Sequence, residues 1–215
     1  MKYNEQSDRE ALNAKVKSLT EERNKLIEAN ANLQKTTEEN EILRQQLGFF
    51  ARSKFHYVVS NVISRGDLTS TTKLPETITI DKGTKDGIYK GLAVVSGDGI
   101  IVGKVVETKE EMAEVNLTNN DYCKLAATVF NDSKTDGITE GELGLTMKMS
   151  FIPQSAVIKQ GDLVVTSGLE EAIPRGLVIG KVLEVKSESN DMWQTAVIEP
   201  LVNPDDLIIV SVVLP

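Results

Sequence analysis

Few residues of this chain have the types and spacing that enzymatic chemistry requires. His56 is the only histidine, so any mechanism with a histidine base depends on that one residue. A serine hydrolase also needs an aspartate and an activated serine beside an oxyanion hole. Ser96, in VVSGDG, and Ser167, in VVTSGL, occupy predicted hairpin turns instead. We therefore expect no catalytic residues, and a serine hydrolase related to the trypsin-like proteases stays as the enzymatic alternative.

The other reactive side chains do not suggest a cofactor. The single cysteine, Cys123, cannot form an internal disulfide and has no metal-type spacing around it, so it is predicted to be a small buried hydrophobe. Asp132, Asp136, Glu140 and Glu142 gather in NDSKTDGITEGE, which is typical of a solvated acidic turn. A weak calcium site is the alternative there. The sequence predicts neither a metal nor another cofactor.

The charge and hydropathy of the chain exclude several kinds of partner. A net charge of −8 disfavours nucleic acid and anionic lipid, because both are bound by clustered lysine and arginine. No run of about 18 apolar residues is present to span a membrane. The polar stretch after Met1 also lacks the apolar core of a signal peptide. We expect either a cytosolic protein or one whose membrane anchor belongs upstream and is absent from this chain.

Residues 1–50 are predicted to form a coiled-coil dimerisation helix. From about residue 8 to 47 the chain lacks glycine and proline and is rich in helix formers, and Gly48 is predicted to end the helix. Apolar residues recur with a period of 3.5, and Asn30 at a core position favours a parallel homodimer in register. A lone helix packed on the rest of the chain is the alternative. The predicted seam consists of Leu12, Val16, Leu19, Leu26, Asn30, Leu33 and Leu47.

After residue 50 the chain consists of short β-branched runs separated by glycine, Asp-Gly and proline turns. About a dozen such runs without intervening helical stretches predict a mainly β fold. Trp193, at the junction of a loop and a strand, is predicted to pack in the core rather than to serve as a ligand platform.

The β region contains an internal repeat. Residues 88–107 and 158–185 align with one another and end in GIIVGKVVE and GLVIGKVLE. In both copies a mid-strand glycine permits the bend that closes a small barrel. The repeat predicts two small antiparallel β-barrels of related design, at 51–132 and 133–215, with terminal strands that could cross between them.

The segment IKQGDLVVTSGLEEAIPRGLVIGKVLEV resembles the signature of the MreC family of bacterial rod-shape-determining proteins. ENEILRQQLGF, VISRGD and FIP are similar to other family segments and occur in the family order, so the resemblance runs from about residue 20 to 215. Two loops depart from the family pattern: Ile173 replaces an aromatic residue, and Asn119–Tyr122 replaces an Asp-Pro turn. The matching signature residues, taken as structural, are Gly161, Asp162, Thr166, Ser167, Gly168, Pro174, Gly176 and Gly180.

The resemblance implies a non-catalytic scaffold of the cell-wall elongation machinery that maintains rod cell shape. Such a protein dimerises through its coiled coil, assembles further with itself, and binds a penicillin-binding transpeptidase that synthesises peptidoglycan. Its other family partners are MreD and MreB, and it takes no nucleic acid and no cofactor. Its place is the extracytoplasmic face of the plasma membrane, held by an anchor that we expect to be missing here. A secreted, calcium-modulated adhesion module is the third hypothesis.

Overall fold

The N-terminal part of the chain is a single long helix. Helix α1 spans Lys2–Phe50, and at 1.5 Å per residue it is roughly 70 Å long. It continues past Gly48, so the prediction that this glycine ends the helix is wrong. Glycine inside a helix costs only about 1 kcal/mol relative to alanine, which does not prevent two further helical residues.

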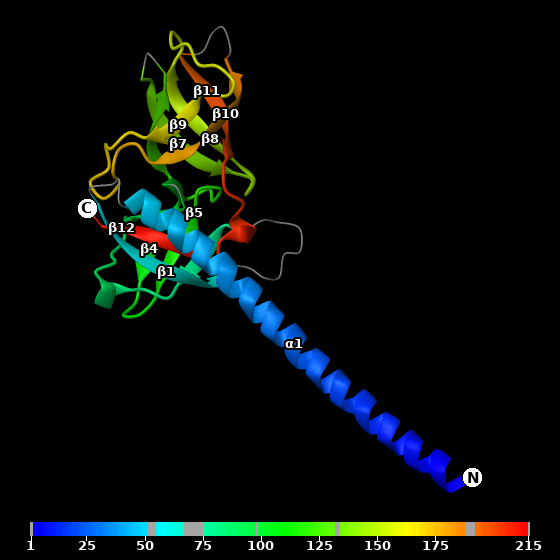
Figure 1. Cartoon of the computed structure of the whole chain (residues 1–215). Helices are drawn as coiled ribbons and strands as arrows, with labels where there is room; N and C mark the ends of the chain where they lie inside the picture. The colour runs from blue at the N-terminus through cyan, green and yellow to red at the C-terminus, as the bar shows by residue number, and fades with distance from the viewer. Residues whose placement is uncertain are drawn as a thin grey trace. The chain divides into compact units, whose positions relative to one another are not determined.

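The structure is a computed structural model that describes residues 2–50, 55–66, 75–97, 99–131, 134–187 and 192–214, with the side chains of α1 described for 15–43. The chain divides into two compact units, Met1–Arg44 and Gln45–Pro215. All the strands belong to the second unit, where they gather in two groups (Figure 1). Within the described ranges, no helix has both the length and the apolar character needed to cross a membrane.

One group of strands closes into an antiparallel ring, the first barrel. Its strands, in ring order, are β1 (His56–Arg65), β2 (Thr77–Ile80), β5 (Ala113–Leu117), β4 (Ile100–Thr108), β3 (Ala93–Ser96) and β12 (Ile209–Leu214). β12 pairs with β1 as well as with β3, which closes the ring. Aliphatic side chains fill its interior, among them Ile78, Ile80, Leu92, Val94, Val105, Val115, Leu117, Val210 and Val212.

The remaining strands close into the second barrel. In ring order they are β7 (Asp136–Glu142), β8 (Thr146–Pro153), β11 (Trp193–Pro200), β10 (Val178–Lys186), β9 (Leu163–Thr166) and β6 (Leu125–Phe130). Pairing of β6 with both β7 and β9 completes this ring. Its core also takes in Ala93, Val95, Ile101 and Val213, which the strands of the first barrel contribute. The two barrels therefore share a packed junction.

Both rings have the same strand order, so the predicted fold class is confirmed. Strands β1 to β5 of the first barrel correspond to β7 to β11 of the second, and β12 corresponds to β6. β6 lies in the second barrel although the division expected at residue 132 placed it in the first, and β12 lies in the first barrel, a crossing of a terminal strand that the prediction left open. The sequence repeat covers only β3–β4 and β9–β10, so it does not determine which strand fills the sixth place of each ring.

The repeated mid-strand glycines have matching surroundings. A Cβ atom on Gly103 would lie 2.3 Å from the carbonyl oxygen of Asn116, and one on Gly180 would lie 2.4 Å from that of Glu199. A β-bulge follows shortly after the glycine in both β4 and β10. Each glycine thus permits a close approach of the neighbouring strand, and the bulge then curves the pair.

Candidate interaction surfaces

An apolar stripe on α1 is exposed. Its described members Val16, Leu19, Leu26 and Leu33 are between 54% and 66% exposed, and Asn30 is exposed as well. Leu12 and Leu47, at the two ends of the predicted seam, lie outside the residues whose side chains the structure describes. Side chains at these spacings share one face of a helix, which a second helix would cover in a coiled coil. Dimerisation stays a prediction.

The signature segment contains β9, the loop that follows it and most of β10. Thr166, at the end of β9, is fully buried. Its Oγ1 donates a hydrogen bond to the carbonyl oxygen of Pro174 at 2.5 Å and accepts one from the backbone N–H of Leu177 at 3.0 Å. The N–H of Gly176 donates to the carbonyl oxygen of Thr166 at 2.9 Å. Thr166 therefore fastens the far end of the loop to the end of the strand.

The other signature residues shape turns around this loop. Gly161, Gly168 and Gly176 have positive φ angles of 91°, 77° and 92°, and Gly180 provides the close approach described above. Asp162 Oδ2 accepts from the N–H of Lys159 at 2.9 Å, and Ser167 Oγ accepts from the N–H of Leu169 at 3.3 Å. Pro174 is buried. The signature residues thus shape turns and hold the loop in place, and no two of them are arranged as a nucleophile and a base.

Thr166→Val is expected to lower the free energy of unfolding by about 2 kcal/mol, because it leaves the Pro174 carbonyl and the Leu177 N–H buried without their partner. Urea unfolding followed by circular dichroism measures the change. Thr166→Ser keeps the hydroxyl and should lose much less stability. Equal losses in the two variants would show that the methyl group matters here rather than the hydrogen bonds.

Each of the two departures from the family pattern includes a buried residue. Asn119 is 2% exposed, and its Nδ2 donates to the carbonyl oxygens of Pro75 at 3.1 Å and Gly144 at 2.8 Å. Pro75 precedes β2 of the first barrel, whereas Gly144 joins β7 to β8 of the second. Ile173 is 3% exposed and packs in the second core. Asn119 therefore ties the barrels together, and Ile173 fills the interior.

An exposed apolar cluster covers part of the outside of the second barrel. Trp193 and Phe151 meet edge to face, with ring centroids 6.4 Å apart, and are 46% and 57% exposed. Met192, beside Trp193, is also exposed, as is Ile138 on the neighbouring strand β7. We call Ile138, Phe151, Met192 and Trp193 the aromatic patch. Contiguous exposed apolar surface of this kind marks interaction sites in soluble proteins.

A backbone irregularity places Phe151 in this patch. On β8, Met149 pairs with Ala196 and Ile152 with Gln194, so two residues of β8 lie opposite one residue of β11. Phe151 takes up the extra position with a φ of 62°, a left-handed conformation that costs a residue other than glycine about 1–2 kcal/mol. The bulge turns the Phe151 ring outward, since Met149 and Ile152 both face the core.

The prediction that Trp193 packs in the core is wrong. Its strand neighbour Gln194 takes the inward position, where Nε2 donates to the carbonyl oxygens of Pro153 at 2.9 Å and Ala156 at 2.7 Å. Side chains of a strand alternate between its two faces, so an inward Gln194 directs Trp193 outward. A buried glutamine next to an exposed tryptophan is the reverse of the usual hydropathy order.

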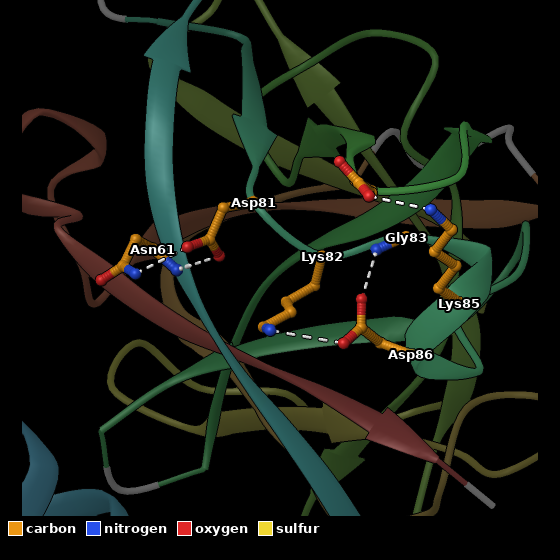
Figure 2. Close-up of polar contacts among 7 residues, drawn as sticks. Asn61, Asp81, Lys82, Gly83, Lys85 and Asp86 are labelled. Carbon is orange, nitrogen blue, oxygen red and sulfur yellow. Dashed lines mark hydrogen bonds and ion pairs between the residues drawn. The ribbon is translucent and has the colours of Figure 1, made fainter.

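A polar cluster stabilises the turn after β2 in the first barrel (Figure 2). Asp81 accepts from the backbone N–H of Asn61 at 2.8 Å and from its side-chain amide at 2.7 Å. Asp86 accepts from the N–H of Gly83 at 3.1 Å and pairs with Lys82 at 3.3 Å. The hydrogen bond from Gly83 is the main reason that the pKa of Asp86 is lowered. The carboxylates of Asp81 and Asp86 therefore both have hydrogen-bond or ion-pair partners within the cluster.

The same turn is fastened to the β4–β5 hairpin. Lys85 lies in the short 3₁₀ helix η1 (Thr84–Asp86). Its Nζ lies 2.8 Å from Glu111 Oε1 and 3.2 Å from Glu110 Oε2, and hydrogen bonds to both glutamates raise the pKa of Lys85. Its backbone N–H donates to the Glu110 carbonyl oxygen at 3.1 Å. Because Lys82 and Lys85 are paired with carboxylates of the same cluster, these charges stabilise the turn.

His56 forms no described hydrogen bond with either candidate serine, Ser96 or Ser167. His56 is exposed at the start of β1, opposite Leu214. Ser96 ends β3, and Ser167 caps the turn after β9. No described hydrogen bond links His56 to either serine, so the serine hydrolase arrangement is missing from the described part of the chain.

The acidic turn gives no sign of an ion site. Thr128 Oγ1 donates to Asp136 Oδ1, and Glu140 pairs with Lys124 at 3.2 Å. Asp132 lies outside the described residues. Within the described ranges, no three His, Cys, Asp or Glu side chains are grouped as metal ligands.

Comparison with known proteins agrees with this architecture. The family model described as rod shape-determining protein MreC, barrel core, matches residues 62–214. The cell shape-determining protein MreC of Geobacillus stearothermophilus is 31% identical over 188 residues, which cover 82% of this chain and 63% of that protein. The chain thus spans less than two thirds of this relative's length.

Solved structures have the same fold. A structure of MreC superposes with a TM-score of 0.73 at 28% identity and covers 83% of this chain and 99% of that one. A complex between penicillin-binding protein PBP2 and MreC from Helicobacter pylori contains a chain with a TM-score of 0.60 at 20% identity, covering 74% of this chain and 99% of that one. At that identity the second likeness establishes the fold alone.

Proposed function

Because the chain belongs to the MreC family of rod shape-determining proteins, we propose that it is a scaffold that holds enzymes of cell-wall elongation in place. Its relatives are named for cell shape and not for a reaction, and the chain is not an enzyme. The barrels supply rigid surfaces, since both are closed and filled with aliphatic side chains. Rod shape then depends on what these surfaces bind.

The proposed partner of the β body is a penicillin-binding transpeptidase. The aromatic patch is the observation that carries this proposal. Phe151 is held outward by a strained backbone and meets a half-exposed tryptophan, and aromatic side chains of this kind dominate the energetics of protein interfaces. The H. pylori relative in complex with PBP2 supports the class of partner.

We further propose that the protein works as a parallel homodimer on the extracytoplasmic face of the plasma membrane. The exposed apolar stripe of α1 supports pairing, and the polar Asn30 within it supports a parallel register. A common membrane would hold two such helices together and raise their effective concentration. MreD and MreB are the further partners that family membership suggests, together with higher assembly of the dimers.

Phe151→Asn is expected to weaken binding to a soluble penicillin-binding transpeptidase from the same bacterium by at least about tenfold, as the loss of a central aromatic contact does. Asparagine tolerates the left-handed backbone at this position, so the barrel should keep its fold. Isothermal titration calorimetry with the whole chain measures the dissociation constant. Trp193→Ser should act in the same way.

Phe130→Asn is the matched control for this experiment. Phe130 ends β6 and is 69% exposed, but it does not belong to the aromatic patch. Its replacement should leave the affinity unchanged. If Phe151→Asn binds as tightly as the unaltered chain, the transpeptidase does not dock on the aromatic patch.

A further inference from the structure

An ion pair joins the two barrels. Lys104 lies on β4 of the first barrel, and Glu170 lies in the β9–β10 loop of the second. Lys104 Nζ is 2.8 Å from Glu170 Oε2 and also donates to the carbonyl oxygen of Lys124 at 2.8 Å. Glu170 Oε1 accepts from the N–H of Ala126 at 2.8 Å. Lys124 and Ala126 lie where the chain enters β6, so the pair also ties down the crossing between the barrels.

This pair is better shielded than the other described ion pairs. The side chains of Lys104 and Glu170 are 22% and 30% exposed, whereas each other described pair has at least one side chain that is 38% exposed or more. Partial burial weakens screening by water and salt. Hydrogen bonds to charged groups are about twice as strong as neutral ones. The network at Lys104 and Glu170 is therefore worth more than a surface ion pair.

Among the described residues, few other polar contacts join the strands of the two barrels directly. β4 and β10 share a single parallel bridge, at Ile100 and Val178. The N–H of Val178 donates to the carbonyl oxygen of Gly99 at 3.2 Å, and a single hydrogen bond of this kind contributes little to stability. The apolar junction, the Asn119 side chain and the N–H of Gly141, which donates to the carbonyl oxygen of Asn120 at 3.2 Å, join the barrels as well. Removing the ion pair should therefore loosen the junction around the start of β6, while the strand pairing that closes each barrel stays in place.

The only cysteine of the chain lies beside this pair. Cys123 directly precedes Lys124 and is 2% exposed. Burial raises the pKa of its thiol to about 12, and Lys104 and Glu170 are the charged groups that influence it. A buried thiol with such a pKa reacts slowly with disulfide reagents. Any opening at the ion pair should therefore be visible as faster reaction of Cys123.

We propose that Lys104 and Glu170 form a latch that fixes the orientation of the two barrels, and that its release opens the junction at Cys123 without unfolding either barrel. The latch is not a product of the sequence repeat. Lys181 occupies the place of Lys104 in the second barrel, yet it is exposed and forms no ion pair with the described residues. The latch belongs to the junction, and it does not depend on the partner proposed above.

The test is the rate at which Cys123 of the whole chain reacts with 5,5′-dithiobis(2-nitrobenzoate). Glu170→Gln and Lys104→Met should each raise this rate at least about tenfold, because both exposure and the thiolate fraction increase on opening. Lys181→Met and Glu171→Gln are the matched controls and should react as slowly as the unaltered chain.

The dependence on urea separates opening of the junction from unfolding. Local opening at the ion pair exposes much less surface than global unfolding, so labelling of Glu170→Gln should rise far less steeply over about 0–1 M urea than a rate limited by global unfolding. Slow labelling of both latch variants would overturn the proposal. Fast labelling that rises with urea as global unfolding does would overturn it too.

Discussion

Gly180→Ala is expected to lower the free energy of unfolding by about 3 kcal/mol or more, at the upper end of the cost of overpacking. The new Cβ would lie 2.4 Å from the carbonyl oxygen of Glu199 and 2.8 Å from Ile198 Cγ2. A backbone oxygen cannot rotate aside as a side chain can, so β10 and β11 would have to separate. Trp193 is the only tryptophan and lies on β11, so its fluorescence during urea unfolding reports the effect.

Gly176→Ala is the control for this substitution. Gly176 has a φ of 92°, but nothing lies within 4 Å of a Cβ atom placed there, so only the cost of a left-handed residue, about 1–2 kcal/mol, applies. Gly103→Ala should reproduce the larger loss in the first barrel, where the Asn116 oxygen lies 2.3 Å away. If Gly180→Ala costs no more than Gly176→Ala, crowding by the neighbouring strand is not what requires glycine.

Aspartate at Leu19, Leu26 and Leu33 together is expected to abolish self-association of the chain. Pairing would bring these side chains to the centre of a coiled coil, and each buried carboxylate is costly without a partner. We expect the dissociation constant of the dimer to rise at least about 100-fold, which corresponds to about 2.7 kcal/mol. Sedimentation velocity over a range of concentrations measures this change.

A matched variant carries the same charges on the other faces of α1. Ser18→Asp, Asn24→Asp and Asn32→Asp replace exposed residues at positions outside the predicted seam, so the dimer should persist. If both triple variants sediment alike, the seam has been placed wrongly. A monomer at high concentration for the unaltered chain would contradict dimerisation itself.

The sequence was most informative where a local pattern determines the structure. The lack of glycine and proline before residue 48 predicts α1, because helix formation depends on near neighbours along the chain. The repeated glycines predict two barrels of one design, since Gly103 and Gly180 meet the same constraint in both copies. Of the candidate sites, the signature loop could be located from the sequence motif alone. The structure adds the two hydrogen bonds of the Thr166 hydroxyl that hold the loop in place.

The parts that could not be predicted depend on contacts between distant residues. The sequence left open whether a terminal strand crosses between the barrels, because the entry of β12 into the first barrel is decided by pairing with β1 and β3, about 100 residues or more away. Phe151 faces outward because of a bulge on β8 opposite Thr195, which changes the alternation of that strand without a glycine to reveal it, whereas Trp193 follows the regular alternation of β11. Lys104 and Glu170 are 66 residues apart, and nothing local distinguishes Lys104 from its repeat counterpart Lys181.

The late return of the chain to the first barrel affects how the protein is synthesised. Strands β6 to β11 are consecutive, so the second barrel can close without β12, whereas the first barrel cannot. Until β12 emerges, β1 and β3 keep unpaired backbone groups, and open edges of this kind invite pairing with other chains. The first barrel begins to form earlier but is finished later, which makes the nascent N-terminal half the part most in need of protection from aggregation.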